Sequence, residues 1–227
     1  MEIPVPSIET IKVGWDWILK NLQVWFQVLR EPSEVLEKRD LDSTDTLIAA
    51  IQFAVFPVAL ASIVQLPLYL MTKDTAFGFV GYFVVCAVAY PTVVFICAAS
   101  QRTGAVIFRG KGSLTACTIS TLYATAFWPL VELVNYSELM NHRETYKKLY
   151  AGAPDSLTSG DVTALWIDVS VLAIITIYLI SKFVPMTRVV HKVGRFRALM
   201  ICLLTMIVAT VLTNSVIQPI QKMLLFP

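Results

Sequence analysis

The stretch TLIAAIQFAVFPVALASIVQLPLYLMT, residues 46–72, decides the fold, because its 27 residues include no Asp, Glu, Lys or Arg. About 20 apolar residues suffice for a helix to cross a hydrocarbon layer roughly 30 Å thick. The whole chain has the same character: 56% of its 227 residues are hydrophobic and 15% are charged. Soluble domains have about 45–50% apolar and about 25% charged residues. The sequence therefore predicts an integral membrane protein.

Four more stretches are long and apolar enough to cross the membrane. They are residues 75–101, 112–131, 162–181 and 198–221, and the only charge within the five spans is Asp168. Inside lipid every backbone donor and acceptor needs an internal partner, so these spans are expected to be helices. We expect an all-α, polytopic protein with a five-helix transmembrane bundle over residues 47–227. Residues 1–46 form a separate cytoplasmic N-terminal segment in this interpretation.

The distribution of basic residues predicts the orientation. Thirteen Lys and Arg fall on the side of the N-terminus and five on the other side, and basic residues collect in cytoplasmic loops. The N-terminus is therefore expected in the cytoplasm and the C-terminus outside. The loop before the last span carries five of these residues, and the four nearest that span are Arg188, Lys192, Arg195 and Arg197. They either face anionic lipid headgroups, which we favour, or attract the N-terminal segment, whose net charge is −4.

An amphipathic helix is predicted within residues 8–29. Its apolar residues recur every three or four positions: Ile8, Ile11, Trp15, Ile18, Leu19, Leu22, Trp25, Phe26 and Leu29. Such a helix lies on the membrane surface or along the edge of the bundle. Docking into the groove of a partner protein is the alternative. Pro32 ends the helix, because the residue before a proline avoids helical geometry.

The third span has small residues at every fourth position: Gly112, Ala116, Ser120 and Ala124. They share one helix face, which predicts close packing against a neighbouring helix. The alternative is a polar lining for permeation, built from Ser113, Thr115, Thr118, Thr121 and Thr125.

No set of residues in the sequence points to an enzyme. Asp168 is expected to be interfacial or partnered, because a proton or cation site needs a second inward charge and the other spans have none. The four cysteines match no metal spacing and are expected to be small core residues. His142 and His191 are expected on opposite sides of the membrane. We therefore predict no catalytic residue, no cofactor and no metal, and the net charge of +2 gives no footprint for nucleic acid.

Three short motifs resemble those of the Yip family, the Ypt/Rab-interacting type of five-span membrane protein. They are the proline motif Leu29-Arg30-Glu31-Pro32-Ser33-Glu34-Val35-Leu36, the stretch Gly110-Lys111-Gly112-Ser113-Leu114 with Tyr123 and Pro129 beyond it, and Val193-Gly194-Arg195-Phe196-Arg197-Ala198. Eukaryotic relatives often carry a D-L-Y-G-P motif, where this chain has Asp40-Leu41-Asp42-Ser43-Thr44. The resemblance therefore suggests a prokaryotic member, located in a bacterial inner membrane.

The resemblance implies a non-enzymatic scaffold or organiser. Its expected partners are the lipid bilayer with its anionic headgroups and other membrane proteins, with further copies of the chain as a possibility. A subunit of a small-solute or ion transporter or channel is the alternative, suggested by Asp168 and the hydroxyl groups of the third span.

Overall fold

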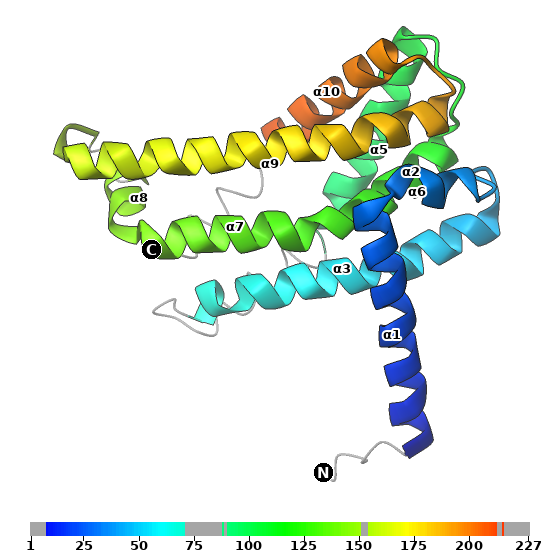
Figure 1. Ribbon diagram of the computed structural model, residues 1–227, viewed down its shortest axis with the longest axis horizontal. Helices are drawn as coiled ribbons and strands as arrows, with labels where there is room; N and C mark the ends of the chain where they lie inside the picture. The colour runs from blue at the N-terminus through cyan, green and yellow to red at the C-terminus, as the bar shows by residue number, and fades with distance from the viewer. Residues whose placement is uncertain (1–7, 71–87, 89, 151–153, 213–214, 216–227) are drawn as a thin grey trace.

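The computed structural model describes residues 8–70, 88, 90–150, 154–212 and 215. This part of the chain is all-helical and contains no strand, as expected (Figure 1). The α-helices are α1 (Ile8–Arg30), α2 (Pro32–Glu37), α3 (Thr44–Leu70), α5 (Tyr90–Ile107), α6 (Leu114–Ala124), α7 (Trp128–Asn141), α8 (Arg143–Tyr150), α9 (Ser159–His191) and α10 (Arg195–Leu212). Two short 3-10 helices are η2 (Thr125–Phe127) and η3 (Pro154–Ser156).

Three helices of the described part are long and apolar enough to cross a membrane: Thr44–Val64, Leu114–Ser137 and Ser159–His191. They correspond to the first, third and fourth expected spans. The second of them combines α6, η2 and the first part of α7. In Figure 1 the axes of α3, α7 and α9 follow the long direction of the molecule.

The helix ends differ from the expected span ends because caps, rather than charges, set them. α6 begins at Leu114, where the Ser113 side chain accepts a hydrogen bond from the Ala116 N–H. α9 begins with a capping box between Thr158 and Asp161 and runs to His191, ten residues beyond the expected end at Ser181.

The predicted loops are correspondingly shorter. Only residues 192–194 separate α9 from α10, and Lys192 turns the chain with a φ of 52°. The long loop expected over residues 132–161 contains the second half of α7 and all of α8. The connection before the last span and the outer connection are therefore largely helical.

The second and fifth expected spans lie partly outside the described residues. Their described parts, α5 and α10, pack against each other. Gly104 marks the contact, since a Cβ built there would lie 3.3 Å from Leu204 and 3.4 Å from Ile201. A small residue at this position lets the two helices approach closely.

The core joins the N-terminal segment to the long helices. Val28 of α1 and Leu36 of α2 are fully buried, beside Tyr123 and Phe127 at the junction of α6 and η2. The Phe53 and Tyr123 rings stack with centroids 5.0 Å apart. α2 packs against α9, and the end of α1 packs against α3 and η2. Apolar side chains of the segment 1–46 are thus part of the same core as the long helices.

α1 crosses the long helices instead of following them (Figure 1). Its end is held by three hydrogen bonds. Trp25 Nε1 donates to the Ala126 carbonyl at 2.7 Å, Lys182 Nζ donates to the Arg30 carbonyl at 2.8 Å, and Tyr178 Oη donates to the Leu29 carbonyl at 3.4 Å. The last two satisfy carbonyls that a helix end leaves without an internal partner. Residues 12–20, by contrast, are exposed.

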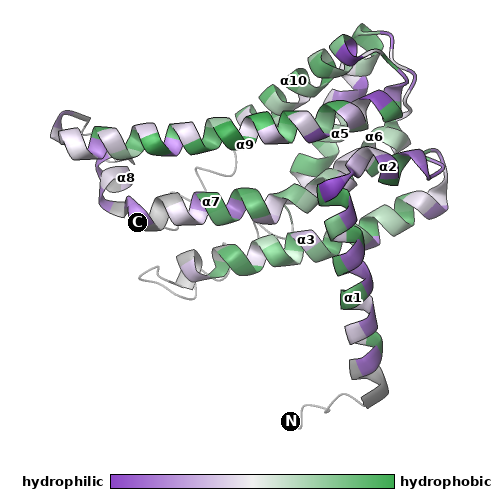
Figure 2. Cartoon of the chain, in the orientation of Figure 1, coloured by the Kyte–Doolittle hydropathy of each residue, from purple (hydrophilic) through white to green (hydrophobic). Residues whose placement is uncertain are grey.

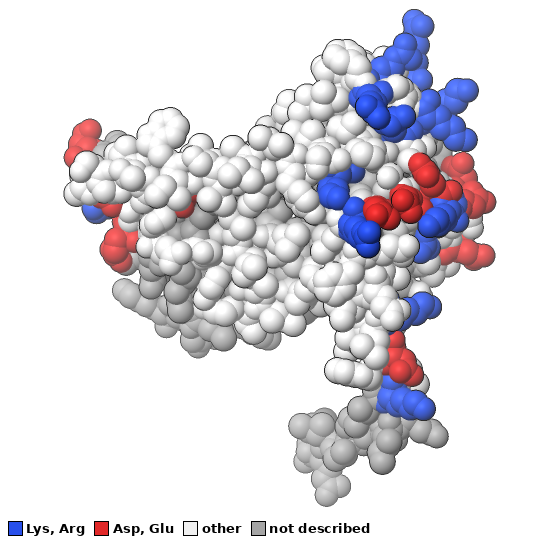
Figure 3. Space-filling view, in the orientation of Figure 1, with Lys and Arg blue, Asp and Glu red and all other residues white. Residues whose placement is uncertain are grey.

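Hydrophobic residues dominate the middle of α3, α7 and α9, and hydrophilic residues collect at the turns (Figure 2). On the face drawn in Figure 3, charged side chains gather at the two ends of the long helices and leave an uncharged band between them. The end with α2 and the α9–α10 turn, hereafter the charged end, carries most of them.

Candidate functional site

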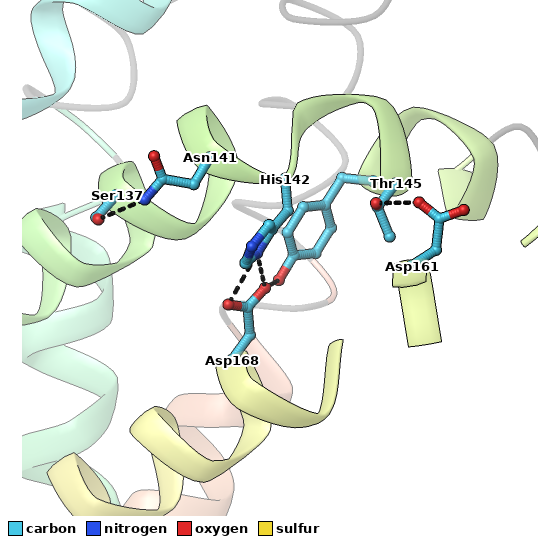
Figure 4. A network of polar contacts seen from close by, with 7 residues as sticks. Ser137, Asn141, His142, Thr145, Asp161 and Asp168 are labelled. Carbon is cyan, nitrogen blue, oxygen red and sulfur yellow. Dashed lines mark hydrogen bonds and ion pairs between the residues drawn. The ribbon is translucent and has the colours of Figure 1, made fainter. Parts of the chain in front are cut away.

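A polar cluster lies at the other end, where the turn between α7 and α8 meets α9 (Figure 4). Asp168 of α9 is 4% exposed. His142 Nδ1 lies 3.0 and 2.9 Å from its two carboxylate oxygens, and Tyr146 Oη donates to Oδ2 at 2.9 Å. In the tautomer that carries its proton on Nδ1, His142 donates to this carboxylate. A buried carboxylate is thereby held by two donors, which lowers the cost of burying it.

A second carboxylate of α9 extends this cluster. Asp161 accepts a hydrogen bond from Thr145 Oγ1 and an ion-paired bond from Lys148 Nζ at 2.8 Å. It also accepts bonds from the N–H and hydroxyl of Thr158, both at 2.8 Å. Asp161 and Asp168 therefore connect α8 to α9 mainly through polar bonds.

Sequence reasoning missed His142 and Tyr146 as partners of Asp168, because it assigned them to a loop. One signal was present in the sequence. His142 and Tyr146 are four residues apart, as are the first and last positions of a helical turn, and so share a face of any helix formed there. The structure places His142 beside Asp168, in the first third of α9, and His191 at the last residue of α9. That the two lie on opposite sides of a membrane stays a prediction.

A second site lies at the charged end, where the loop Gly110-Lys111-Gly112 covers His191. The His191 side chain is fully buried, and its Nδ1 has no hydrogen-bond partner in the described part of the chain. A Cβ built on Gly112 would lie 2.5 Å from Nδ1, and one on Gly110 would lie 2.9 Å from the His191 Cβ. Only glycine fits at Gly112 without displacing the ring.

Hydrogen bonds fix this loop to α5 and α9. The Lys111 N–H donates to the His191 carbonyl at 3.0 Å, and Arg102 Nη1 donates to the Gly112 carbonyl at 2.8 Å. On the far side of the ring, Nε2 is 3.9 Å from the Cys117 Sγ. Arg102, in the second half of α5, is therefore an internal partner of the glycine loop.

The small-residue face of the third span is shorter than expected. Gly112 is not part of it, because it precedes α6 and contacts His191. Ala116 and Ser120 are buried, each 3% exposed, and Ala124 is partly buried at the last residue of α6. Two of the four predicted residues thus pack closely inside the molecule.

The residues of the family-like motifs also fall into the interior. Pro32 is buried as the first residue of α2, and Pro129 is buried in the first turn of α7. Ser113 both caps α6 and donates a hydrogen bond to Asp42, in the turn before α3. The glycine motif and the turn Asp40–Ser43 are in this way joined directly.

Arg188, Lys192, Arg195 and Arg197 surround the short α9–α10 turn, and we call this set the basic corner. All four are exposed, and within the described residues no hydrogen bond or ion pair engages their side chains. Glu31 and Glu34 of the N-terminal segment pair with its own Arg30 and Lys38. The segment docks through apolar contacts, through its helix-end carbonyls and through the bonds Trp25–Ala126 and Ser113–Asp42.

In the described part of the chain no group of three or more His, Cys, Asp or Glu side chains is arranged to hold a metal ion. Cys97, Cys117 and Cys202 are buried free thiols, and Cys86 lies outside the described residues. The chain matches no family model, and comparisons with curated proteins and with solved structures give no match.

Proposed function

We propose that this chain is a non-enzymatic integral membrane protein that organises partner membrane proteins and anionic lipid at its charged end. The observation that carries the proposal is the basic corner. Its four basic side chains are exposed, have no partner among the described residues and lie beside an uncharged band. They suit the headgroups of anionic lipids, at about 1 kcal/mol per residue near the surface.

The proposal includes the membrane arrangement expected from the sequence. Five spans, with α5 and α10 completed by neighbouring residues, leave the N-terminus in the cytoplasm and the C-terminus outside. The charged end is then cytoplasmic, in agreement with the positive-inside rule. The resemblance to the Yip family supports a scaffold of this kind in a bacterial inner membrane.

The lipid half of the proposal is tested in nanodiscs made from phosphatidylcholine mixed with phosphatidylglycerol. The nanodiscs are then dissolved in detergent, and the lipid that stays bound to the purified protein is measured by mass spectrometry. We expect enrichment of phosphatidylglycerol, and its loss when all four residues of the basic corner are changed to Gln. The control changes Glu31, Glu34 and Glu37 of the same end to Gln and should keep the enrichment. Equal retention of both lipids by the wild-type protein would contradict the proposal.

The partner half is tested by cross-linking in native membranes. A photo-reactive residue at Arg195 should give discrete adducts with other membrane proteins, whereas the same residue at Ile174, in the exposed middle of α9, should give mainly lipid adducts. Identical patterns at both positions would contradict a partner site at the charged end.

The second candidate is a transporter or channel subunit, and the polar cluster favours it. Asp168 with His142 and Tyr146 provides a buried carboxylate within a long apolar helix, a common feature of ion pathways. Proton or cation flux in proteoliposomes that Asp168→Asn abolishes would support this function over the scaffold.

A further inference from the structure

We infer that α1 inserts as a wedge into one leaflet of the membrane. It thereby concentrates the protein where the membrane bends with that leaflet on the convex side. The inference rests on the membrane arrangement proposed above. It assigns a binding role to the exposed half of α1, and the ligand is the boundary between headgroups and acyl chains.

The depth of α1 follows from α9. Asp161 and Lys182 are 21 residues apart in this helix, so they are separated by roughly 32 Å along its axis. This is about the thickness of the hydrocarbon layer. Lys182 donates its hydrogen bond to the last carbonyl of α1. The end of α1 therefore lies at the boundary of the layer when Asp161 lies at the opposite boundary.

The direction of α1 completes this placement. Because α1 crosses the long helices in Figure 1, its axis runs along the membrane plane when those helices span it. The second half is fastened through Trp25, Val28 and Arg30. Near the middle of α1, the Trp17 ring meets Phe56 of α3 edge to face, with centroids 6.3 Å apart. The residues before Trp17 extend beyond the bundle at the same depth.

The side chains of α1 divide into three faces at about 100° per residue. The first face packs on the bundle and contains Asn21, Trp25 and Val28. The second contains Trp15, Leu19 and Phe26, which fall within about 40° of one another and are 60%, 42% and 58% exposed. The third contains the exposed polar residues Asp16, Lys20, Gln23 and Gln27.

These faces indicate lipid as the occupant of the second face. Figure 3 shows the charged side chains of α1 along the edge nearer the charged end, and none along the opposite edge. A groove in a partner protein does not require that all charge point to one side of the plane, whereas a lipid–water boundary does. An exposed Trp is also common at this depth.

Curvature preference follows from the one-sided placement. The described spanning helices displace lipid along their whole length, but α1 adds volume only at the level of one headgroup region. Expanding one leaflet relative to the other is relieved when the membrane bends with that leaflet on the convex side. Helices of this type are accordingly sensitive to curvature.

The test uses the full chain, labelled with a fluorophore at Gly194→Cys, where a side chain meets open space. The protein is reconstituted into giant vesicles of phosphatidylcholine and phosphatidylglycerol, from which narrow tubes are pulled. An impermeant quencher identifies molecules whose charged end faces outward. For these we expect a severalfold higher density on the tube than on the vesicle, increasing as the tube narrows. Molecules of opposite orientation should be depleted.

The matched variants separate the wedge from the bundle. Trp15→Ser with Leu19→Ser and Phe26→Ser should reduce the density ratio toward unity. Asp16→Ser with Lys20→Ser and Gln23→Ser, which leaves the net charge unchanged, should retain the enrichment. Enrichment that survives the first triple change would assign the preference to the shape of the bundle and overturn the inference.

Three other outcomes are distinct. A ratio of unity for the wild-type protein at every tube radius overturns the wedge while leaving the proposed function intact. A protein that alkaline carbonate extracts from the vesicles refutes the membrane arrangement and the proposed function together. In the third outcome, wild-type spots bleach in two steps and those of the Trp15, Leu19 and Phe26 variant in one. A second copy of the chain then covers this face of α1, which also overturns the wedge.

Discussion

Asp168 shows at the scale of single residues how an apolar helix accommodates a buried carboxylate. Its partners come from residues 142–146, which lie outside α9 and close back on it through the α7–α8 turn. The sequence indicates that such a carboxylate needs a partner. It does not identify His142, because the contact depends on how far α7 and α8 extend.

Removing one member of this cluster should destabilise the protein. We expect His142→Ala to lower the free energy of unfolding in detergent by about 1–3 kcal/mol, because the buried carboxylate loses a donor. His142→Phe combined with Asp168→Leu should recover part of the loss, since the buried carboxylate is removed together with its histidine donor. Thermal unfolding of the single and double variants measures this difference. An unchanged midpoint for His142→Ala would mean that water solvates Asp168.

A second prediction at the scale of single residues concerns Gly112. Gly112→Ala places a methyl group against the His191 ring and the Val190 carbonyl, and overpacking of this kind costs about 1–3 kcal/mol. Gly194→Ala is the control, because a Cβ there meets nothing within 4 Å. The two variants should differ clearly in detergent thermostability. Equal stability would show that the loop moves away from His191 without cost.

At the scale of helices, the amphipathic α1 and the long apolar helices were predictable from the sequence, but α2, α8 and most helix ends were not. Runs without charge located α3, α6 and α9, but Lys182 and Arg188 lie inside α9, and Glu132 lies inside α7. A charge does not end a helix when its side chain reaches a partner or solvent, as Lys182 does at the Arg30 carbonyl. The capping residues Ser113 and Thr158 marked the true starts.

The buried face of α6 should tolerate large side chains poorly. Ala116→Leu or Ser120→Leu should cost about 1–3 kcal/mol, because both positions are 3% exposed in the core. Leu122→Ala, at a partly buried position on another side of α6, should cost less. Thermal aggregation in detergent compares the three. Equal tolerance would indicate that lipid or water, not a helix, faces Ala116 and Ser120.

At the scale of the whole molecule, composition predicted a membrane protein, and the charge-free stretches predicted the helical class and the long apolar helices. The docking of α1 and α2 into the core was not predictable from them. The apolar pattern of residues 8–29 left open whether this helix lies on the membrane surface or along the edge of the bundle. The burial of Val28, Val35 and Leu36 shows where the segment packs. The glycine motif likewise needed the position of His191 to be understood.

The orientation gives a prediction for the whole molecule. Cysteine is placed at Gly194, beside the basic corner, or at Asp155 in η3, near the opposite end of α9. An impermeant maleimide should label Gly194→Cys only in inverted membrane vesicles and Asp155→Cys only in intact cells without their outer membrane, because basic residues favour the cytoplasmic side. The reverse pattern would contradict both the orientation and the family resemblance.

The bonds at Asp161 and Lys182 have a further consequence for where such a protein can reside. Because the cluster around His142 covers Asp168, Asp161 and Lys182 mark the two ends of the apolar part of α9, and the length between them is fixed. Where the hydrocarbon core of a bilayer is thinner than this length, the bilayer must thicken locally or the helix must tilt. Either costs fractions of a kcal/mol per Å of mismatch. In a cell with membranes or domains of unequal thickness, hydrophobic mismatch alone would sort this protein toward the matching bilayer.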